Sequence, residues 1–411
     1  MKAAGRRVDR RWRHALAFTA GLLAFAWLLG VRDRAPSERV PAFVPADSTA
    51  VLERLPRRLV ASPGRDGNAS PNALNADVPE PTDARREADA VALARRHVAA
   101  SRAWGDPREL GYAQAALSRW WNDAEPPVDV ALVRAVIHSQ QHDFDAALAD
   151  LRSVTRREPG NVQGWLSRAS IEQTTGRLDD ARQSCRHLVT LPAAFVGRVC
   201  LEDLASLTGD RAAFDRLKAV LQGAAIRQAE RGWAHGVLAE MAERLDRPDD
   251  AERAFAVALI DDAGTYARTA FADFLMRDAR WADAARILEG APATDAVLLR
   301  RAIALRALGD ARAAALGDEL RARFADERLR GGAVHLREMA RFALEFEHAP
   351  ETALADAQRN WSHQKEPADL LLLIAAARAA GRPSAAADGE RFIARYGIVD
   401  ARLDDARGGA R

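Results

Sequence analysis

One feature constrains the fold more than any other: residue types return at fixed offsets about every 34 residues, a period typical of helix–turn–helix repeats. In residues 161–192 an aromatic residue is followed by small, glycine, alanine, bulky, apolar and proline positions. These seven residues are Trp165, Ala169, Gly176, Ala181, Cys185, Leu188 and Pro192. One period earlier, residues 130–159 carry the matching Ala135, Ala147, Leu151, Val154 and Pro159. A single hairpin cannot bury its apolar side alone, so the period predicts hairpins that stack into a solenoid.

The pattern continues along most of the chain, with a turn signal inside each predicted hairpin. Glycine after the first helix takes the left-handed conformation easily, and aspartate or proline beside it begins the second helix. We place further hairpins over residues 87–126, 196–222, 231–259, 265–290, 295–324, 331–367 and 368–396. Where helices approach closely we expect small residues, among them Ala314, Ala355 and Ala386.

This order of residue types resembles the tetratricopeptide repeat (TPR), in a protein of the exported or membrane-anchored bacterial type. The resemblance implies an all-α fold, a right-handed α-solenoid of stacked helical hairpins whose first helices line a concave groove. The alternative is an array of helical hairpins of another kind. Composition agrees with both, because alanine, leucine, arginine and glutamate favour helices and the alternation typical of strands is absent.

The N-terminus predicts the compartment. Six basic residues between Lys2 and Arg13 precede an apolar run over residues 15–31. Such a pattern is typical of an export signal, and the basic end stays in the cytoplasm. We therefore expect residues 1–31 to be a signal or membrane-anchor segment, with a single span in the inner membrane and the repeat array in the periplasm. The alternative is a secreted or periplasmic protein released by cleavage near Ala26, where residues 24–26 have a small-x-small pattern.

The rest of the chain divides into three predicted parts. Residues 32–83 form a Pro-rich linker that is partly disordered, because prolines interrupt any long helix. Within it, residues 47–59 predict either a short helix that docks on the array or a transient helix in a tether. Residues 84–400 form the helical repeat array, and residues 401–411 form a flexible tail.

The chain has two cysteines, Cys185 and Cys200. The TPR resemblance places Cys185 in the second helix of one unit and Cys200 in the first helix of the next, and these helices pack against each other. An oxidising compartment permits a bridge between them. We predict this disulfide, with a stabilisation of roughly 2–3 kcal/mol. The alternative is two unrelated buried thiols.

Motifs that carry chemistry are not found. His138 and His142 have the helical spacing of a metal-ligand pair, but His142 falls at a predicted turn, so both histidines are interpreted as structural. We find no nucleophile elbow, phosphate loop or zinc spacing. The formal net charge of +2 does not suggest a nucleic-acid binder. We therefore predict a protein that is not an enzyme and has no catalytic residues, no cofactor, no metal and no nucleic-acid partner.

In TPR proteins the first helices line the groove, and the resemblance carries this role to particular positions here. The lysine and asparagine set that clamps a peptide carboxylate is missing from them. Trp121 is singled out separately as a candidate for partner contact, since its neighbour Trp120 is expected to pack in a second helix and leave Trp121 turned outward or into the following unit. The expected groove residues are Gln163, Ser170, Gln173, Thr174, Tyr266 and Asp273.

Two functional hypotheses remain. The first is an exported or membrane-anchored TPR scaffold that binds a protein or peptide partner in the cell envelope. The second is an accessory or specificity subunit of an envelope enzyme or assembly system, for example cytochrome maturation or cell-wall metabolism. A receptor for a small ligand or a metal requires a polar cluster inside the array, and the sequence does not reveal one.

Overall fold

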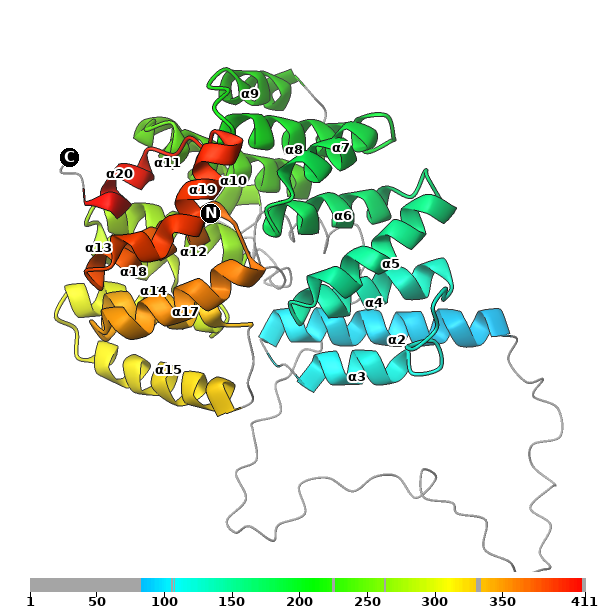
Figure 1. Ribbon diagram of the computed structural model, residues 1–411, viewed down its shortest axis with the longest axis horizontal. Helices are drawn as coiled ribbons and strands as arrows, with labels where there is room; N and C mark the ends of the chain where they lie inside the picture. The colour runs from blue at the N-terminus through cyan, green and yellow to red at the C-terminus, as the bar shows by residue number, and fades with distance from the viewer. Residues whose placement is uncertain are drawn as a thin grey trace, which may run out of the picture.

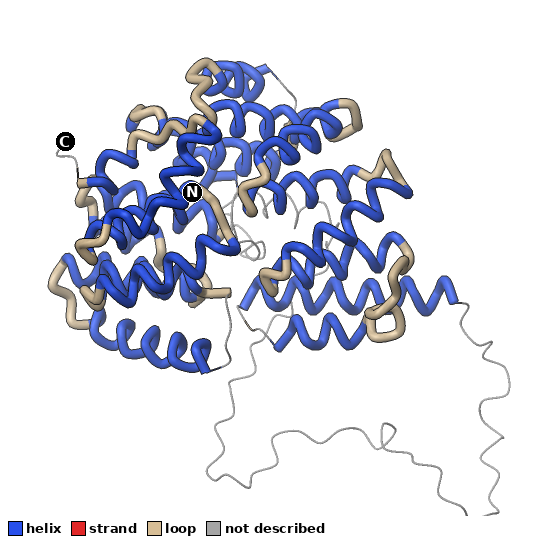
Figure 2. Tube along the Cα trace, viewed as in Figure 1, coloured by secondary structure: helices blue, strands red, loops and turns tan. Residues whose placement is uncertain are grey.

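The fold is known from a computed structural model that describes residues 83–408, except residues 105, 107, 224–225, 262–263 and 330–333. Within that part of the chain every regular element is a helix, and no strand occurs (Figure 2). Consecutive helices pack against each other along the chain, so the protein is an all-α solenoid of stacked helical hairpins (Figure 1).

In the described residues the helices pair into nine hairpins. The first five pairs are α2 (Asp83–Trp104) with α3 (Arg108–Ala116), α4 (Val128–Gln140) with α5 (Phe144–Arg157), α6 (Val162–Thr174) with α7 (Leu178–Val189), α8 (Ala194–Leu207) with α9 (Ala213–Gly223), and α10 (Gln228–Arg244) with α11 (Pro248–Asp261). They are followed by α12 (Thr265–Arg277) with α13 (Trp281–Ile287), and by α14 (Asp295–Ala307) with α15 (Arg312–Leu329). In the eighth pair α16 (Leu336–Arg341) continues as the π-helix η2 (Phe342–Phe346) and packs on α17 (Pro350–His363). In the last, α18 (Pro367–Ala379) packs on η3 (Pro383–Ala386) and α19 (Ala387–Tyr396), and α20 (Arg402–Arg407) follows.

The turn inside most hairpins has the same backbone geometry. In the α6–α7 turn Gly176 is left-handed at φ 73°, and the Arg177 N–H donates to the Glu172 carbonyl five residues back. This bond is typical of a glycine-terminated helix. Where the sequence lacks a glycine, His142, Asp246 and Ala279 take the same left-handed conformation. The turn therefore recurs because the two helices require it, not only because glycine permits it.

Small residues let neighbouring helices approach closely, as the repeat predicts. Ala147, Ala169 and Ala181 are fully buried. At Gly197 in α8, a Cβ atom would lie 2.7 Å from the backbone nitrogen of Val189 in α7. The backbones of α7 and α8 therefore meet at a distance that only glycine allows at this position.

The array does not end as an open spiral. One apolar core cluster combines side chains from α6, α7 and α8 with side chains from residues 340–406. Figure 1 shows the C-terminal helices, in orange and red, beside the green helices of the middle of the chain. The C-terminal hairpins thus return to the middle of the array and close it.

One expectation about the ends of the chain differs from the structure. Residues 401–411 were expected to be a flexible tail, but they contain α20, which packs on α18. The reason is that Leu403 and Ala406, three residues apart, lie on one face of a helix, and both are buried.

The predicted anchor, the alternative cleavage site at Ala26 and the segment over residues 47–59 lie outside the described residues. A search of the described helices finds none that combines the length and the apolar character needed to cross a bilayer.

Candidate functional site

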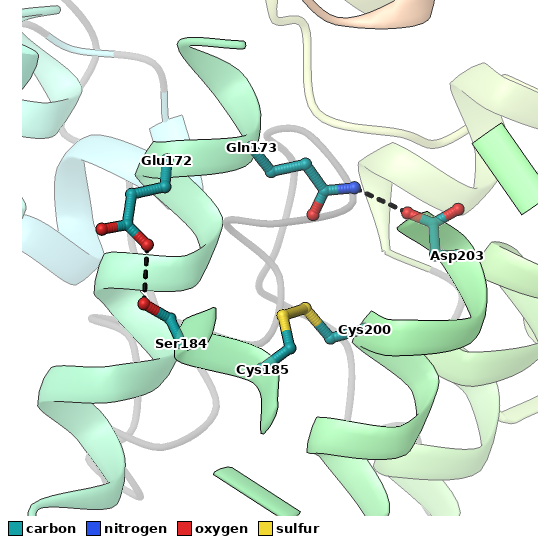
Figure 3. The surroundings of a disulfide bond; sticks show 6 residues. All are labelled: Glu172, Gln173, Ser184, Cys185, Cys200 and Asp203. Atoms are coloured by element: carbon teal, nitrogen blue, oxygen red, sulfur yellow. Dashed lines mark hydrogen bonds between the residues drawn. A yellow bond between two sulfur atoms is a disulfide. The ribbon is translucent and has the colours of Figure 1, made fainter. Parts of the chain in front are cut away.

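The two cysteines join consecutive hairpins. Cys185 of α7 and Cys200 of α8 form a disulfide with sulfurs 1.89 Å apart and Cα atoms 5.9 Å apart (Figure 3). The close approach of α7 and α8 at Gly197 brings the two helices within reach of such a bond. The bridge fixes the junction between the α6–α7 unit and the α8–α9 unit.

Around the disulfide, polar side chains tie α6 to both of these helices. The Ser184 hydroxyl donates to Glu172 at 2.6 Å, and Gln173 donates to Asp203 at 2.7 Å (Figure 3). Glu172 also accepts from Arg168 at 2.7 Å. Burial raises the pKa of Glu172, although these two hydrogen bonds act in the opposite direction. The disulfide therefore sits in a junction fixed by both covalent and polar contacts.

Most of the expected groove residues on α6 are engaged inside the chain. Ser170 and Thr174 are only 4% and 2% exposed, so neither presents its side chain to solvent. The Thr174 hydroxyl donates to Glu366 at 3.3 Å, and the Gln163 amide donates to Ser167 at 2.9 Å. The Thr174 bond and the Gln173 contact to Asp203 place these two side chains between elements of the array, whereas the Gln163 bond stays within α6.

On α12 the two expected groove residues have different surroundings. Tyr266 is half-buried. Asp273 is bound by Arg300 of α14 and by Arg341 of α16, both at 2.6 Å. Burial alone would raise the pKa of Asp273, but the two guanidinium groups outweigh it and the pKa is lowered. Asp273 therefore links three successive first helices instead of facing a ligand.

The structure reveals a polar cluster that the sequence did not predict, the central charge cluster: Asp203, Glu240, Glu243, Arg244, Arg277, Asp400 and Arg402. Arg244 binds Asp203, and Arg277 binds Glu243. From the C-terminal segment, Arg402 binds Asp400 at 2.6 Å and reaches Glu243 at 3.5 Å. The cluster thus joins α8, α10 and α12 to residues far away in the sequence.

Glu240 determines the charge balance of this cluster. It keeps some accessible surface, but burial dominates and raises its pKa to about 8. It is therefore largely protonated at pH 7. The remaining groups are three arginines and three carboxylates, so the cluster is neutral. The sequence signal for the cluster was only partial: Glu240, Glu243 and Arg244 have helical spacing near the end of a first helix, but nothing in the sequence points to their partners in α8, α12 and the C-terminal segment.

His138 and His142 both pack against side chains of the chain itself. His142 lies in the turn after α4, at φ 60°, and stacks on Phe144 at 5.2 Å between ring centroids. Burial is the largest cause that lowers its pKa to about 4. His138 lies 3.4 Å from Asp143 and stacks on Trp121 at 5.0 Å. Across the described chain, no three His, Cys, Asp or Glu residues are grouped so that they could hold a metal ion.

Trp121 was expected to turn outward or into the following unit, beside a Trp120 packed in a helix. In the structure α3 ends at Ala116 and both tryptophans follow it in a turn. Trp121 is half-buried, packs against the core around α2 and α4, and stacks on His138 of the next unit. Its carbonyl accepts from Arg134 at 2.7 Å. The contacts of Trp121 are therefore within the chain.

A comparison with protein-family models found no matching family, and a search of curated proteins found no match. The candidate function therefore rests on the fold and on the contacts described above.

Proposed function

We propose that this protein is a TPR-like scaffold, anchored in or exported across the inner membrane, that binds a protein or peptide partner in the cell envelope. The observation that carries the proposal is the solenoid of stacked hairpins. Such arrays expose a long continuous surface built from equivalent positions in successive units, and they bind extended peptides or helices with it.

Two further features support the envelope as the location. The Cys185–Cys200 disulfide belongs to an oxidising compartment, because disulfides are rare where thiols are kept reduced. The basic residues before the apolar run over residues 15–31 orient a membrane segment with the following chain outside the cytoplasm. The proposal assigns no catalytic residue and no cofactor.

The location is tested by reporter fusions. A periplasmic phosphatase fused after Pro45 should be active, and a reporter that works only in the cytoplasm, fused at the same place, should be inactive. The opposite result would remove the envelope from the proposal.

Partner binding is tested on the full chain carrying an affinity tag inside residues 62–81, which precede the array in the sequence. After cross-linking in cells and purification, a small set of envelope proteins should be enriched over a control that carries the tag on the anchor alone. Recovery of nothing beyond that control contradicts a scaffold.

A further inference from the structure

The last residues of three successive first helices accept hydrogen bonds from the C-terminal part of the chain. The Thr174 carbonyl, at the end of α6, accepts from the Lys365 N–H at 2.8 Å. The Leu207 carbonyl, at the end of α8, accepts from Val399 at 3.0 Å, and the Arg244 carbonyl, at the end of α10, accepts from Ala401 at 2.9 Å. We name these three oxygens the carbonyl row.

The carbonyl row exists because a helix leaves its last carbonyls without partners inside the helix. Stacked units bring the ends of their first helices to the same edge of the array, so the free oxygens recur from unit to unit. An extended chain that crosses this edge can satisfy them with its N–H groups. This is the way in which an exposed sheet edge binds a peptide, here with helix ends in place of a strand.

Residues 397–402, the docked segment, have the alternation that such a surface selects. The N–H groups of Val399 and Ala401 bind the carbonyl row, whereas Ile398 and Asp400 are buried, at 6% and 7% exposure. Val399 lies over Gly209, which follows α8. Over residues 398–400, alternate residues therefore serve the backbone contacts and the side-chain contacts, as in an extended strand. Ala401, at φ −58° and ψ −24°, then leads into α20, which begins at Arg402.

The charges of the docked segment complement those beneath it. Asp400 accepts from Arg402 at 2.6 Å, and Arg402 also reaches Glu243 of α10. Burial alone would raise the pKa of Asp400, but Arg402 and, more weakly, Arg244, whose carbonyl belongs to the row, outweigh it and the pKa is lowered. An apolar, an acidic and a basic residue at alternate positions thus match a surface that offers an apolar core, Arg244 and Glu243.

From this geometry we infer, resting on the proposed function, that the carbonyl row is the peptide-docking surface of the scaffold. In the absence of a partner the docked segment occupies the Leu207 and Arg244 carbonyls of this row, and Lys365 occupies the Thr174 carbonyl. The partner it fits is a protein segment that is extended through an apolar and an acidic residue at alternate positions and turns into a helix at a basic residue two positions further on, as in Ile398, Asp400 and Arg402. When the partner binds, it replaces the hydrogen bonds and ion pairs of the docked segment with equivalent ones of its own. It breaks contacts between hairpins and leaves the turns and helix pairs of each hairpin intact.

The test uses a fluorescein-labelled peptide with the sequence of residues 396–407 and the full chain in detergent. The Arg402→Ala variant loses the ion pairs to Asp400 and Glu243 but keeps the carbonyl row. It should bind the peptide at least tenfold more tightly than the wild type does, because its own segment competes less. Its amides at Val399 and Ala401 should exchange hydrogen faster. Arg407→Ala is the matched control, since it removes a surface pair with Glu390 from the same C-terminal part.

A peptide in which the isoleucine equivalent to Ile398 is aspartate should not bind. If Arg402→Ala does not fold, Ala401→Pro is measured in the same way. That change removes one N–H from the row at φ −58°, an angle that proline adopts. The inference is overturned if amide exchange accelerates in a folded variant and the peptide still does not bind, or if it binds wild type and variants equally. A scaffold that docks its partner elsewhere would still cross-link that partner in cells, so this failure is distinct from failure of the proposed function.

Discussion

The Thr174 carbonyl accepts a hydrogen bond from the Lys365 N–H at 2.8 Å, and this bond joins the third hairpin to the link between the eighth and ninth. An open solenoid has contacts only between neighbouring units, so a change in one unit is felt locally. Here the contacts of the carbonyl row along α6, α8 and α10, which we call the seam, join units that are far apart in sequence. The middle of the array and its C-terminal part should therefore unfold together.

The first prediction concerns that coupling and the close packing of α7. Replacing the fully buried Ala181 with leucine should overpack the hairpin and destabilise the protein by about 1–3 kcal/mol. Hydrogen exchange should show faster opening in α18 as well as in α6 and α7, because they share one core cluster. Ala314→Leu, at an exposed position of α15, is the control and should leave the melt unchanged. Loss of protection confined to the α6–α7 unit would show that the seam does not couple the two parts.

The disulfide gives the second prediction. Because it closes a loop of sequence separation 15, its removal should lower the free energy of unfolding by about 3 kcal/mol. The double variant Cys185→Ser and Cys200→Ser is compared with wild type by chemical denaturation, with and without reductant. Reductant should destabilise the wild type and leave the double variant unchanged. Equal sensitivity of both proteins would mean that the bond does not form in solution.

Much of the fold was predictable because it depends on local signals. The turn residues and the period located the hairpins, and the placement of Cys185 and Cys200 on adjacent helices followed from them. The register was less secure in the later hairpins, which lack the aromatic residue of the first helix. There Ala313 and Ala353 are buried instead of the expected Ala314 and Ala355, which are exposed.

The seam and the central charge cluster were not predictable for a different reason. A period indicates how neighbouring units stack, but it does not reveal how far the superhelix curves before its ends meet. The contacts of Thr174 with Glu366 and of Arg402 with Glu243 depend on that curvature. The expected groove residues were therefore assigned to an open face, whereas the chain itself covers part of that face.

The third prediction concerns a buried ion pair in the second hairpin. Arg134 binds Asp150 at 2.6 Å and also donates to the carbonyls of Trp120, Trp121 and Asp123. Removing one partner leaves a buried charge without compensation, so Arg134→Ala should destabilise the protein by about 3–5 kcal/mol. Denaturant melts measure the effect. The exposed pair of Arg156 with Glu125 is the control, and Arg156→Ala should change stability by less than about 1 kcal/mol. If both variants lose a similar amount of stability, burial is not what makes the Arg134–Asp150 pair important.

The last prediction follows from Glu240, whose pKa is raised from 4.5 to about 8, with burial as the largest cause. Between these two values the folded chain holds a proton that the unfolded chain releases. Stability linked to this group is fully present below pH 4.5, falls as pH rises and is fully lost above about pH 8. For one proton, the free energy of unfolding changes by at most about 1.4 kcal/mol per pH unit.

Glutamine imitates the protonated carboxyl at every pH, so Glu240→Gln should remove this contribution to the slope. The free energy of unfolding is measured from pH 5 to pH 9 for wild type, Glu240→Gln and the exposed control Glu351→Gln. Wild type and the control should lose stability in parallel as pH rises, while Glu240→Gln loses less and becomes the most stable of the three near pH 8. Parallel curves for all three proteins would mean that Glu240 is ionised in the fold. The central charge cluster would then carry a net negative charge, and the attraction of Arg402 to it would be stronger than the neutral arrangement implies.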